Sequence, residues 1–315
     1  RDPEMSRGLG DVYKRQPTDM PAGVVDLDNT ATTRNIIRNL DAFQQTKIVA
    51  HYAGFAAMVG RPNVGKSTLT NSLIGEKIAI MSDRPQTTRN KIMCIMNTDN
   101  AQIMFLDTPG IHKPHHKLGE YMVRTAEGTL QEVDVILFVI DVTEKRGSGE
   151  DYILELLRKV KTPVILVANK IDKLDDKAKL FKIMEEYSKL YNFAAIVPVS
   201  ALNDGEFPGL VKEITKYLPE GPSYYPDDMI TDQPERVIAA EMIREKVLRL
   251  TRDEVPHSIA VEVEEFKDRD DENVYIRATI FVERESQKGI VIGAKGSLLT
   301  VSYTHLRAHE TSQDL

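Results

Sequence analysis

The most constraining feature of this 315-residue sequence is one glycine-rich stretch, Gly60-Arg-Pro-Asn-Val-Gly-Lys-Ser67. It follows a short apolar run, Phe55–Val59, and directly precedes a helical pattern, Ser67–Leu73. A strand, a G-x-x-x-x-G-K-[ST] loop and the start of a helix are the context in which this motif binds phosphate. Backbone N–H groups and the positive end of the helix then point at the phosphate oxygens. The stretch therefore predicts a phosphate-binding loop within an α/β domain.

Short β-rich runs alternate with amphipathic helical patterns on both sides of this loop. The predicted strands cover residues 55–59, 92–97, 102–107, 135–141, 164–169 and 195–199. The predicted helices cover residues 67–73, 118–130, 151–160, 175–191 and 209–218. Strands separated by helices of this length favour crossover connections, and hence a mostly parallel sheet with helices on both faces. The neighbouring runs at 92–97 and 102–107 are predicted to form an antiparallel hairpin.

Composition narrows the class of protein further. Hydrophobic residues at 41% and charged residues at 28% exclude wholesale disorder, and no apolar run approaches the ~20 residues that span a bilayer. The single cysteine, Cys94, fits a reducing cytoplasm. The net charge of −7 argues against broad non-specific binding of nucleic acid, which depends on Lys and Arg.

A second motif, Asp107-Thr-Pro-Gly110, ends an apolar strand and predicts the rest of a triphosphate site. Lys66 is expected to reach the β- and γ-phosphates, and Ser67 to place its hydroxyl on Mg²⁺. The Asp107 carboxylate is expected to hold the same ion through a water, and the Gly110 N–H to meet the γ-phosphate.

A third motif, Asn169-Lys-Ile-Asp172, predicts which base is bound. Asp172 can accept two hydrogen bonds from the ring N–H and the amino group of guanine. Adenine lacks that amino group, and a carboxylate left without its partner makes the mismatch costly. Ser200-Ala201 follows the last predicted strand, where the Ala201 N–H can donate to guanine O6. The motifs together predict GTP and GDP as ligands.

These motifs in this order resemble the translation-factor-like GTPases, and the resemblance implies a switch that changes shape on hydrolysis. It makes Thr88 the switch threonine that closes over Mg²⁺, with Thr87 as the alternative. Many GTPases carry a glutamine after D-x-x-G, whereas this chain has Ile111, so slow or assisted hydrolysis is expected. Asn63 is either a ligand for K⁺ or a turn-forming residue.

The C-terminal region carries a different signal, Gly293-Ala-Lys-Gly296, after a predicted helix at 234–251, strands at 258–266 and 274–281 and a charged turn at 267–273. In KH domains a G-x-x-G loop clamps single-stranded RNA beside an apolar groove. The order of elements resembles a type II KH domain. The expected RNA-binding residues are Lys288, Ile290, Ile292, Gly293, Ala294, Lys295 and Gly296.

Longer stretches make the resemblance specific, because they run through surface loops as well as shared motifs. GRPNVGKSTLTNSLIGEKIAIMSDRPQTTRN, FLDTPGIHKPHHKLGEYM and ERESQKGIVIGAKG are similar to the Era family of bacterial GTPases, over about residues 54–299. The resemblance implies binding to the 3′ end of 16S rRNA and assistance to 30S ribosomal subunit assembly. It also implies partial peripheral association with the inner membrane. A cytoplasmic, monomeric protein is expected.

We expect a GTPase domain at 49–219, a linker at 220–233 and an incomplete KH domain at 234–300. Residues 1–48 are expected to be a non-native or disordered extension, and residues 301–315 a non-native tail. The KH domain would then lack part of its groove and core, so near-normal GTP binding but weak RNA binding is expected. The expected nucleotide-binding residues are Gly60, Arg61, Pro62, Asn63, Val64, Gly65, Lys66, Ser67, Thr68, Asp107, Thr108, Pro109, Gly110, Ile111, Asn169, Lys170, Asp172, Ser200 and Ala201. Catalytic roles are expected for Lys66, Thr88, Asn63 and Gly110, and metal binding for Ser67, Thr88 and Asp107.

Two other functions remain compatible with the sequence. The first is an RNA-binding assembly scaffold in which GTP mainly controls affinity, which Ile111 keeps open. The second is another phosphate-loop GTPase that carries a KH-like domain.

Overall fold

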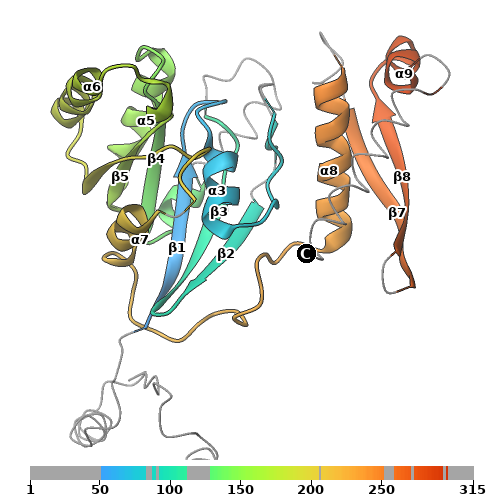
Figure 1. Cartoon of the computed structure of the whole chain (residues 1–315), viewed down its shortest axis with the longest axis horizontal. Coiled ribbons are helices and arrows are strands. Elements are labelled where there is room, and N and C mark those ends of the chain that lie inside the picture. Colours follow the sequence, from blue (N-terminus) through green and yellow to red (C-terminus); the bar gives the residue numbers. More distant parts are fainter. Residues whose placement is uncertain are drawn as a thin grey trace, which may run out of the picture.

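The computed structural model describes residues 51–82, 87–89, 92–111, 128–205, 207–251, 259–270, 273–293 and 296. Within these ranges the chain forms a six-stranded sheet with its helices, followed by a two-stranded sheet with two further helices (Figure 1). The predicted segments 1–48 and 301–315, and most of the predicted helix 118–130, lie outside the described residues.

The large sheet has the strand order β2-β3-β1-β4-β5-β6. Its strands are β1 Tyr52–Val59, β2 Ile92–Thr98, β3 Ala101–Asp107, β4 Val135–Asp141, β5 Val164–Asn169 and β6 Ala195–Pro198. Only β2 runs antiparallel, paired with β3 as the predicted hairpin, and all other neighbours are parallel. The predicted mostly parallel α/β sheet is therefore confirmed.

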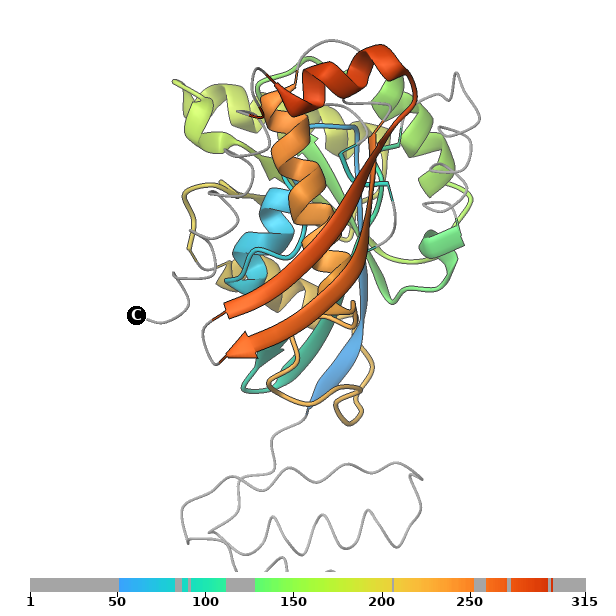
Figure 2. The same cartoon turned by 90° about the vertical axis from the view of Figure 1, so that its right-hand side faces the viewer.

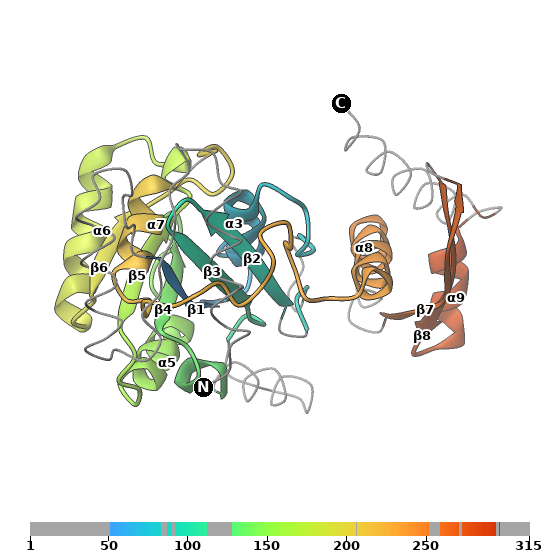
Figure 3. The same ribbon diagram turned by 90° about the horizontal axis from the view of Figure 1, so that it is seen from below.

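Side chains that alternate along the strands build a core on each face of this sheet. On β1, Ala57 and Val59 belong to one cluster, whereas Ala56 and Met58 belong to the other. Continuously apolar strands are expected when helices cover both faces. Figures 1 and 3 show the helices lying on opposite faces of the sheet.

The helices of this part begin and end close to their predicted limits. They are α3 Lys66–Ile74, α5 Ser148–Leu157, α6 Lys177–Leu190 and α7 Pro208–Thr215, with a 3₁₀ turn at Ile171–Lys173. Helix α5 begins three residues earlier than predicted, since residues 151–160 were expected to be helical. The Glu150 carboxylate accepts a hydrogen bond from the Gly147 N–H at 2.9 Å, which stabilises the earlier start.

The C-terminal part contains α8 Glu235–Leu250, β7 Ile259–Asp270, β8 Asn273–Val282 and α9 Glu285–Ile292. Strands β7 and β8 form an antiparallel hairpin that lies along α8 (Figure 2). Val247, Ile259 and Val291 form its small core. The predicted charged turn at 267–273 is wrong in extent, because pairing continues to Asp270 and Asn273. Cross-strand ion pairs, such as Arg277 with Glu265 at 2.7 Å, accommodate charge within the exposed strands.

The predicted linker at 220–233 lies against the large sheet for most of its length. Buried Gln102 accepts hydrogen bonds from the N–H groups of Tyr224 and Tyr225 at 2.7 and 2.9 Å. Near its end, the Ile95 N–H donates to the Ile230 carbonyl at 2.8 Å. Helix α8 follows shortly after and stands between the edge of the large sheet and the hairpin (Figures 1 and 3).

Candidate functional site

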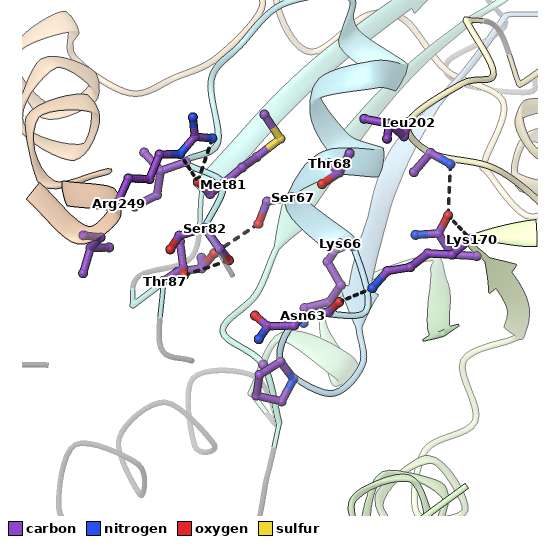
Figure 4. Close-up of a pocket in the computed structure, with 18 of the residues that line it drawn as sticks. Asn63, Lys66, Ser67, Thr68, Met81, Ser82, Thr87, Lys170, Leu202 and Arg249 are labelled. Atoms are coloured by element: carbon purple, nitrogen blue, oxygen red, sulfur yellow. Dashed lines mark hydrogen bonds between the residues drawn. The ribbon is translucent and has the colours of Figure 1, made fainter. Parts of the chain in front are cut away.

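A cavity of about 550 Å³ opens where β1 and β5 end at their carboxyl sides. Ligands of open α/β sheets bind at this edge. The cavity is lined by Pro62, Asn63, Gly65, Lys66, Ser67, Thr68, Ile80, Met81, Ser82, Thr87, Thr88, Gly110, Asn169, Lys170, Asp172, Lys173, Ala201, Leu202, Leu248 and Arg249. The structure thus brings residues of all three predicted motifs to one cavity. Figure 4 shows Lys66 and Ser67 of the first motif and Lys170 of the third.

The phosphate loop uses its two glycines for different reasons. A Cβ on Gly60 would stand 2.4 Å from the Val139 carbonyl oxygen, so β4 passes too close for any side chain. Gly65 has φ +96°, and a Cβ there would stand 2.4 Å from the side-chain nitrogen of Asn169. Only glycine fits both positions, which leaves the loop backbone free to wrap around a phosphate.

Lys66 lies folded over the phosphate loop. Its Nζ donates to the carbonyls of Gly60 and Arg61 at 3.1 and 2.9 Å. Burial lowers the pKa of Lys66 from 10.5 to about 8, although nearby Asp107 acts in the opposite direction. A bound phosphate would add its negative charge to that of Asp107 and stabilise this buried ammonium further.

The predicted metal ligands lie together beside Lys66. The Ser67 hydroxyl donates to Asp107 Oδ2 at 2.7 Å and lies 3.2 Å from the Thr88 hydroxyl. The Thr87 hydroxyl instead donates to the Ser82 carbonyl at 3.4 Å. Asp107 is fully buried, and burial raises the pKa of its carboxyl against the opposing effects of Lys66, Ser67 and Thr88.

Asp107 also has one oxygen available for a further ligand. Among the residues that the structure describes, its Oδ1 has no hydrogen-bond partner. A buried oxygen of this kind costs free energy unless a donor or a cation reaches it. Two hydroxyls and a carboxylate are oxygen ligands of the type that Mg²⁺ takes, so the residues present fit that ion.

The third motif joins the base side of the cavity to the phosphate loop. Asn169 donates from its side-chain nitrogen to the Val64 carbonyl at 2.9 Å, and its oxygen accepts from the Ala201 N–H at 3.0 Å. Exposed Asp172 accepts from the Ser200 hydroxyl at 2.6 Å. Ser200 therefore acts through Asp172 and does not itself line the cavity.

Lys170 crosses the cavity and has a partner that sequence reasoning missed. Its Nζ donates to the Asn63 carbonyl at 2.8 Å and lies 2.5 Å from the carboxylate of Asp141. Asn63 and Lys170 have φ 65° and 66°, and they are the only described non-glycine residues with positive φ. The parallel register of β4 and β5 pairs Asp141 with Asn169, next to Lys170, and only the folded sheet reveals this pairing.

Several predicted nucleotide-binding residues lie behind the cavity wall. The Arg61 guanidinium pairs with Glu144 and Glu150, so its side chain is engaged outside the cavity. Thr108 is buried, and its hydroxyl donates to the Met58 carbonyl at 2.6 Å. Ile111 is fully buried in the core. Gly60, Val64, Asp107, Pro109 and Ser200 also do not line the cavity.

The predicted RNA-binding residues lie at the end of α9. Ile290 and Ile292 are 50% and 38% exposed, whereas Val291 between them packs in the small core. Gly293 and Gly296 have positive φ, as a tight loop requires. Lys288 pairs with Glu285 at 3.3 Å on the exposed face of the helix. Ala294 and Lys295 lie outside the described residues.

Sequence reasoning also missed the contribution of α8 to the nucleotide cavity. Leu248 and Arg249 line it, although they lie more than 130 residues beyond Gly110 in the chain. No local pattern in α8 signals this role.

In the described part of the chain, no helix has the length and apolarity needed to cross a bilayer, and no cluster of metal-ligating His, Cys, Asp and Glu side chains occurs.

Comparison with known proteins agrees with both parts of this description. Residues 55–170 match the family of 50S ribosome-binding GTPases, and residues 254–307 match the KH domain family. The chain is 55% identical to GTPase Era of Staphylococcus haemolyticus over 249 residues, which cover 79% of this chain and 83% of that protein. It is 56% identical to GTPase Era of Clostridioides difficile over 248 residues, covering 78% and 84% of the two chains.

Solved structures give the same result. A crystal structure of Era in complex with MgGDPNP and nucleotides 1506–1542 of 16S ribosomal RNA has a TM-score of 0.77 and 45% identity, covering 81% of this chain and 86% of that chain. A variant of Aquifex aeolicus Era bound to GDP·AlF₄⁻ has a TM-score of 0.75 and 46% identity, covering 80% and 86%. With a guanine-nucleotide site, a KH domain and relatives of this identity, the chain belongs to the Era family of GTPases.

Proposed function

We propose that this GTPase is a Mg²⁺-dependent switch that binds the 3′ end of 16S rRNA and assists assembly of the 30S ribosomal subunit. One observation carries the proposal above the others. The similarity to the relative solved with MgGDPNP and nucleotides 1506–1542 of 16S rRNA covers 81% of this chain. The similarity therefore extends through both the nucleotide cavity and the KH region.

In this proposal Ser67, Thr88 and Asp107 hold Mg²⁺, which supplies positive charge to the β- and γ-phosphates. Their oxygens already lie together in the structure, and Asp107 Oδ1 has no partner among the described residues. Lys66 binds the phosphates, the Gly110 N–H meets the γ-phosphate, and Asp172 selects guanine. Leu202, which is 75% exposed and lines the cavity, covers one face of the base.

Hydrolysis by this site is proposed to need assistance. The Ile111 side chain has no polar group that could orient water, and it is fully buried in the core. Asn63 lines the cavity and is proposed to bind K⁺ there, although its positive φ also suits a turn. Replacing KCl by NaCl should slow single-turnover hydrolysis of GTP, and Asn63→Ala should remove the difference. Equal rates in both salts would overturn the K⁺ site.

The RNA site is proposed at the end of α9. Ile290 and Ile292 present apolar surface for bases, and Gly293 and Gly296 allow close approach of the sugar-phosphate backbone. Lys288 and Lys295 are proposed to supply positive charge, and Ala294 belongs to the same proposed site. A local site of this kind is compatible with a net charge of −7.

The decisive test uses fluorescence anisotropy with the full chain, GDPNP and a labelled RNA that matches the 3′ end of 16S rRNA. A scrambled RNA of equal composition is the control. We expect preferential binding of the native RNA, and a loss of at least about tenfold for Gly293→Asp, which puts a carboxylate beside the phosphates. Gly289→Ala, on open helix surface, is the matched variant. Equal affinity for both RNAs would overturn the RNA proposal.

The buried Ile111 favours a second candidate, an RNA-binding scaffold in which turnover is incidental. Single-turnover hydrolysis measured with and without the RNA separates the two. Stimulation by RNA supports the switch, whereas tight RNA binding with unchanged hydrolysis supports the scaffold.

The remaining attributes are proposals that rest on the family resemblance. They are a GTPase domain at 49–219, a linker at 220–233 and a KH domain at 234–300. They also include a monomeric, cytoplasmic protein with peripheral association with the inner membrane. Light scattering of the purified chain tests the monomer, and flotation with anionic vesicles tests the membrane association.

A further inference from the structure

Helix α8 of the C-terminal part touches the segment that carries the switch threonine. Thr87 and Thr88 line the nucleotide cavity, and α8 contributes Leu248 and Arg249 to the same cavity. Figure 4 shows Arg249 beside Met81, across the cavity from Lys170. The two parts of the molecule therefore meet at the nucleotide site itself.

Glu245 is the centre of this contact. Its side chain is completely buried, and it accepts from Lys77 Nζ at 2.9 Å and from the Met81 N–H at 3.2 Å. Arg249, one turn later on α8, contributes a third donor at 3.0 Å. A buried carboxylate is stable only when donors surround it. Two of its three donors come from the GTPase part, so Glu245 joins the two parts.

Arg244 extends the contact to the switch itself. The residue is 2% exposed, and its guanidinium donates to the Thr87 carbonyl while pairing with Glu241 on its own helix. Further along the segment, Arg89 donates to the Ile259 carbonyl at the start of β7 at 2.6 Å. The described residues around Thr88 are thus held on both sides by the C-terminal part.

Thr88 is the point at which this contact meets the chemistry. Its hydroxyl lies 3.2 Å from Ser67, the residue that ends the phosphate loop. Thr88 therefore lies beside another proposed metal ligand, and the hydrogen bond from Arg244 to Thr87 is one residue away. A switch threonine engages the metal when a γ-phosphate is present and leaves it in the diphosphate state. Any contact that holds it in place favours the triphosphate.

We propose that Arg244 and Glu245 are positioning residues that hold Thr88 at the metal site and so raise the affinity for GTP relative to GDP. The proposal rests on the proposed role of Thr88. Linkage is reciprocal, so a ligand that displaces α8 must weaken GTP binding by the same factor by which GTP weakens that ligand.

The test measures dissociation constants for GDPNP and GDP in Mg²⁺ with the full chain and no RNA. We expect Arg244→Ala and Glu245→Gln each to lower the preference for GDPNP by at least about fivefold, while GDP affinity is unchanged. Arg244→Lys can still donate to the Thr87 carbonyl and should therefore keep part of the preference for GDPNP. The matched control is Arg236→Ala, an exposed arginine on the same helix.

An equal loss of affinity for GDPNP and for GDP would overturn the proposal, because a residue that only supports the structure would have that effect. No change for either variant would overturn it as well. Lys77→Met breaks the contact between Lys77 and Glu245 from the GTPase side. It replaces the α8 variants in the test if one of them fails to fold. Its effect and that of Glu245→Gln should be non-additive.

Because RNA is absent from these measurements, the result is independent of whether the C-terminal part binds rRNA. A lowered preference for GDPNP with no RNA binding would overturn the proposed function and keep this inference. RNA binding with an unchanged preference for GDPNP in the Arg244 and Glu245 variants would overturn this inference and keep the proposed function.

Discussion

At the scale of single residues, the nucleotide site depends on side chains that face the ligand and on others that hold them. Asp172 faces the cavity, and the Ser200 hydroxyl donates to it. The Ser200 N–H in turn donates to Asp204 at 2.6 Å. The motif residues were predictable from their spacing. Asp204 was not, because its role exists only once the loop is folded.

Replacing Asp172 by Asn should change which base is bound. The amide offers one acceptor and one donor where guanine presents two donors, so GDP affinity should fall by about 100-fold. Xanthine carries an oxygen in place of the amino group, so the affinity for XDP should rise. Competition for a fluorescent nucleotide measures both. Asp175→Asn, on an exposed position of the next turn, should change neither.

The lowered pKa of Lys66, about 8 instead of 10.5, predicts a specific pH dependence. Between these values the unfolded chain binds more protons, so the free energy of unfolding of the nucleotide-free protein rises with pH. Bound phosphates favour the ammonium and raise the pKa again. Binding of GDP near pH 8 should therefore take up about half a proton per site, and the affinity should fall above that pH.

Calorimetry of GDP binding at pH 8 in two buffers of different ionisation enthalpy measures the proton uptake. Guanosine, which carries the same base and no phosphate, is the control and should take up none. Identical binding enthalpies for GDP in both buffers would contradict the lowered pKa of Lys66.

At the scale of secondary-structure elements, the two ends of β4 show how one strand serves both fold and site. Asp134 precedes the strand and accepts from the Phe55 N–H at 2.8 Å, at the far edge of the sheet. Asp141 ends it and contacts Lys170 at 2.5 Å. Burial acts to raise the pKa of Asp141, but hydrogen bonds from Lys170 and Thr143 outweigh it and leave the pKa lowered.

Replacing Asp141 by Asn should therefore loosen the nucleotide without changing the choice of base. Lys170 loses its charged partner and holds the Asn63 carbonyl less firmly, so GDP should dissociate about tenfold faster. Release of a fluorescent GDP analogue measures this rate. Asp134→Asn removes a carboxylate at the other end of β4 and should lower stability while leaving the rate of release unchanged. Faster release of GDP from Asp134→Asn and unchanged release from Asp141→Asn would contradict the role given to Asp141.

Element limits followed the sequence where a continuous apolar run marked the strand, as in β4 and β5, which match their predicted ranges. They shifted where a polar contact decided the boundary, as Glu150 does for α5. The hairpin β7–β8 was predicted too short because its charged residues read as a turn. The ion pair between Arg277 and Glu265 lies within the predicted strands, and the extension to Asp270 and Asn273 rests on backbone pairing, which local charge does not reveal.

At the scale of the whole molecule, the predicted linker is docked on the sheet rather than free over most of its length. Gln102, fully buried on β3, holds the backbone of Tyr224 and Tyr225 with three hydrogen bonds of 2.7 to 2.9 Å. Beyond Thr231, whose hydroxyl donates to the Met93 carbonyl at 2.6 Å, α8 begins at Glu235. A rotation of the C-terminal part is therefore expected to use residues 232–234.

Gln102→Ala should lower the free energy of unfolding by about 2–4 kcal/mol, because it leaves buried backbone groups without partners. Urea denaturation followed by circular dichroism measures the change. Asp99→Ala, in the exposed turn of the same hairpin, should stay within about 0.5 kcal/mol of the parent. An unchanged denaturation midpoint for Gln102→Ala would show that the linker is not held by this side chain.

The sequence by itself determined the α/β sheet, the phosphate loop and the guanine-reading motif, because each is encoded by neighbouring residues whose spacing is set by one strand, one loop or one helix. Only the tertiary structure decided that Asp141 supports Lys170 and that Glu245 reaches Lys77, 168 residues earlier in the chain. A polar side chain on a strand end or a helix has no periodicity that names its partner. Folding selects that partner by bringing distant elements together, and the contact between α8 and the switch segment arises in this way.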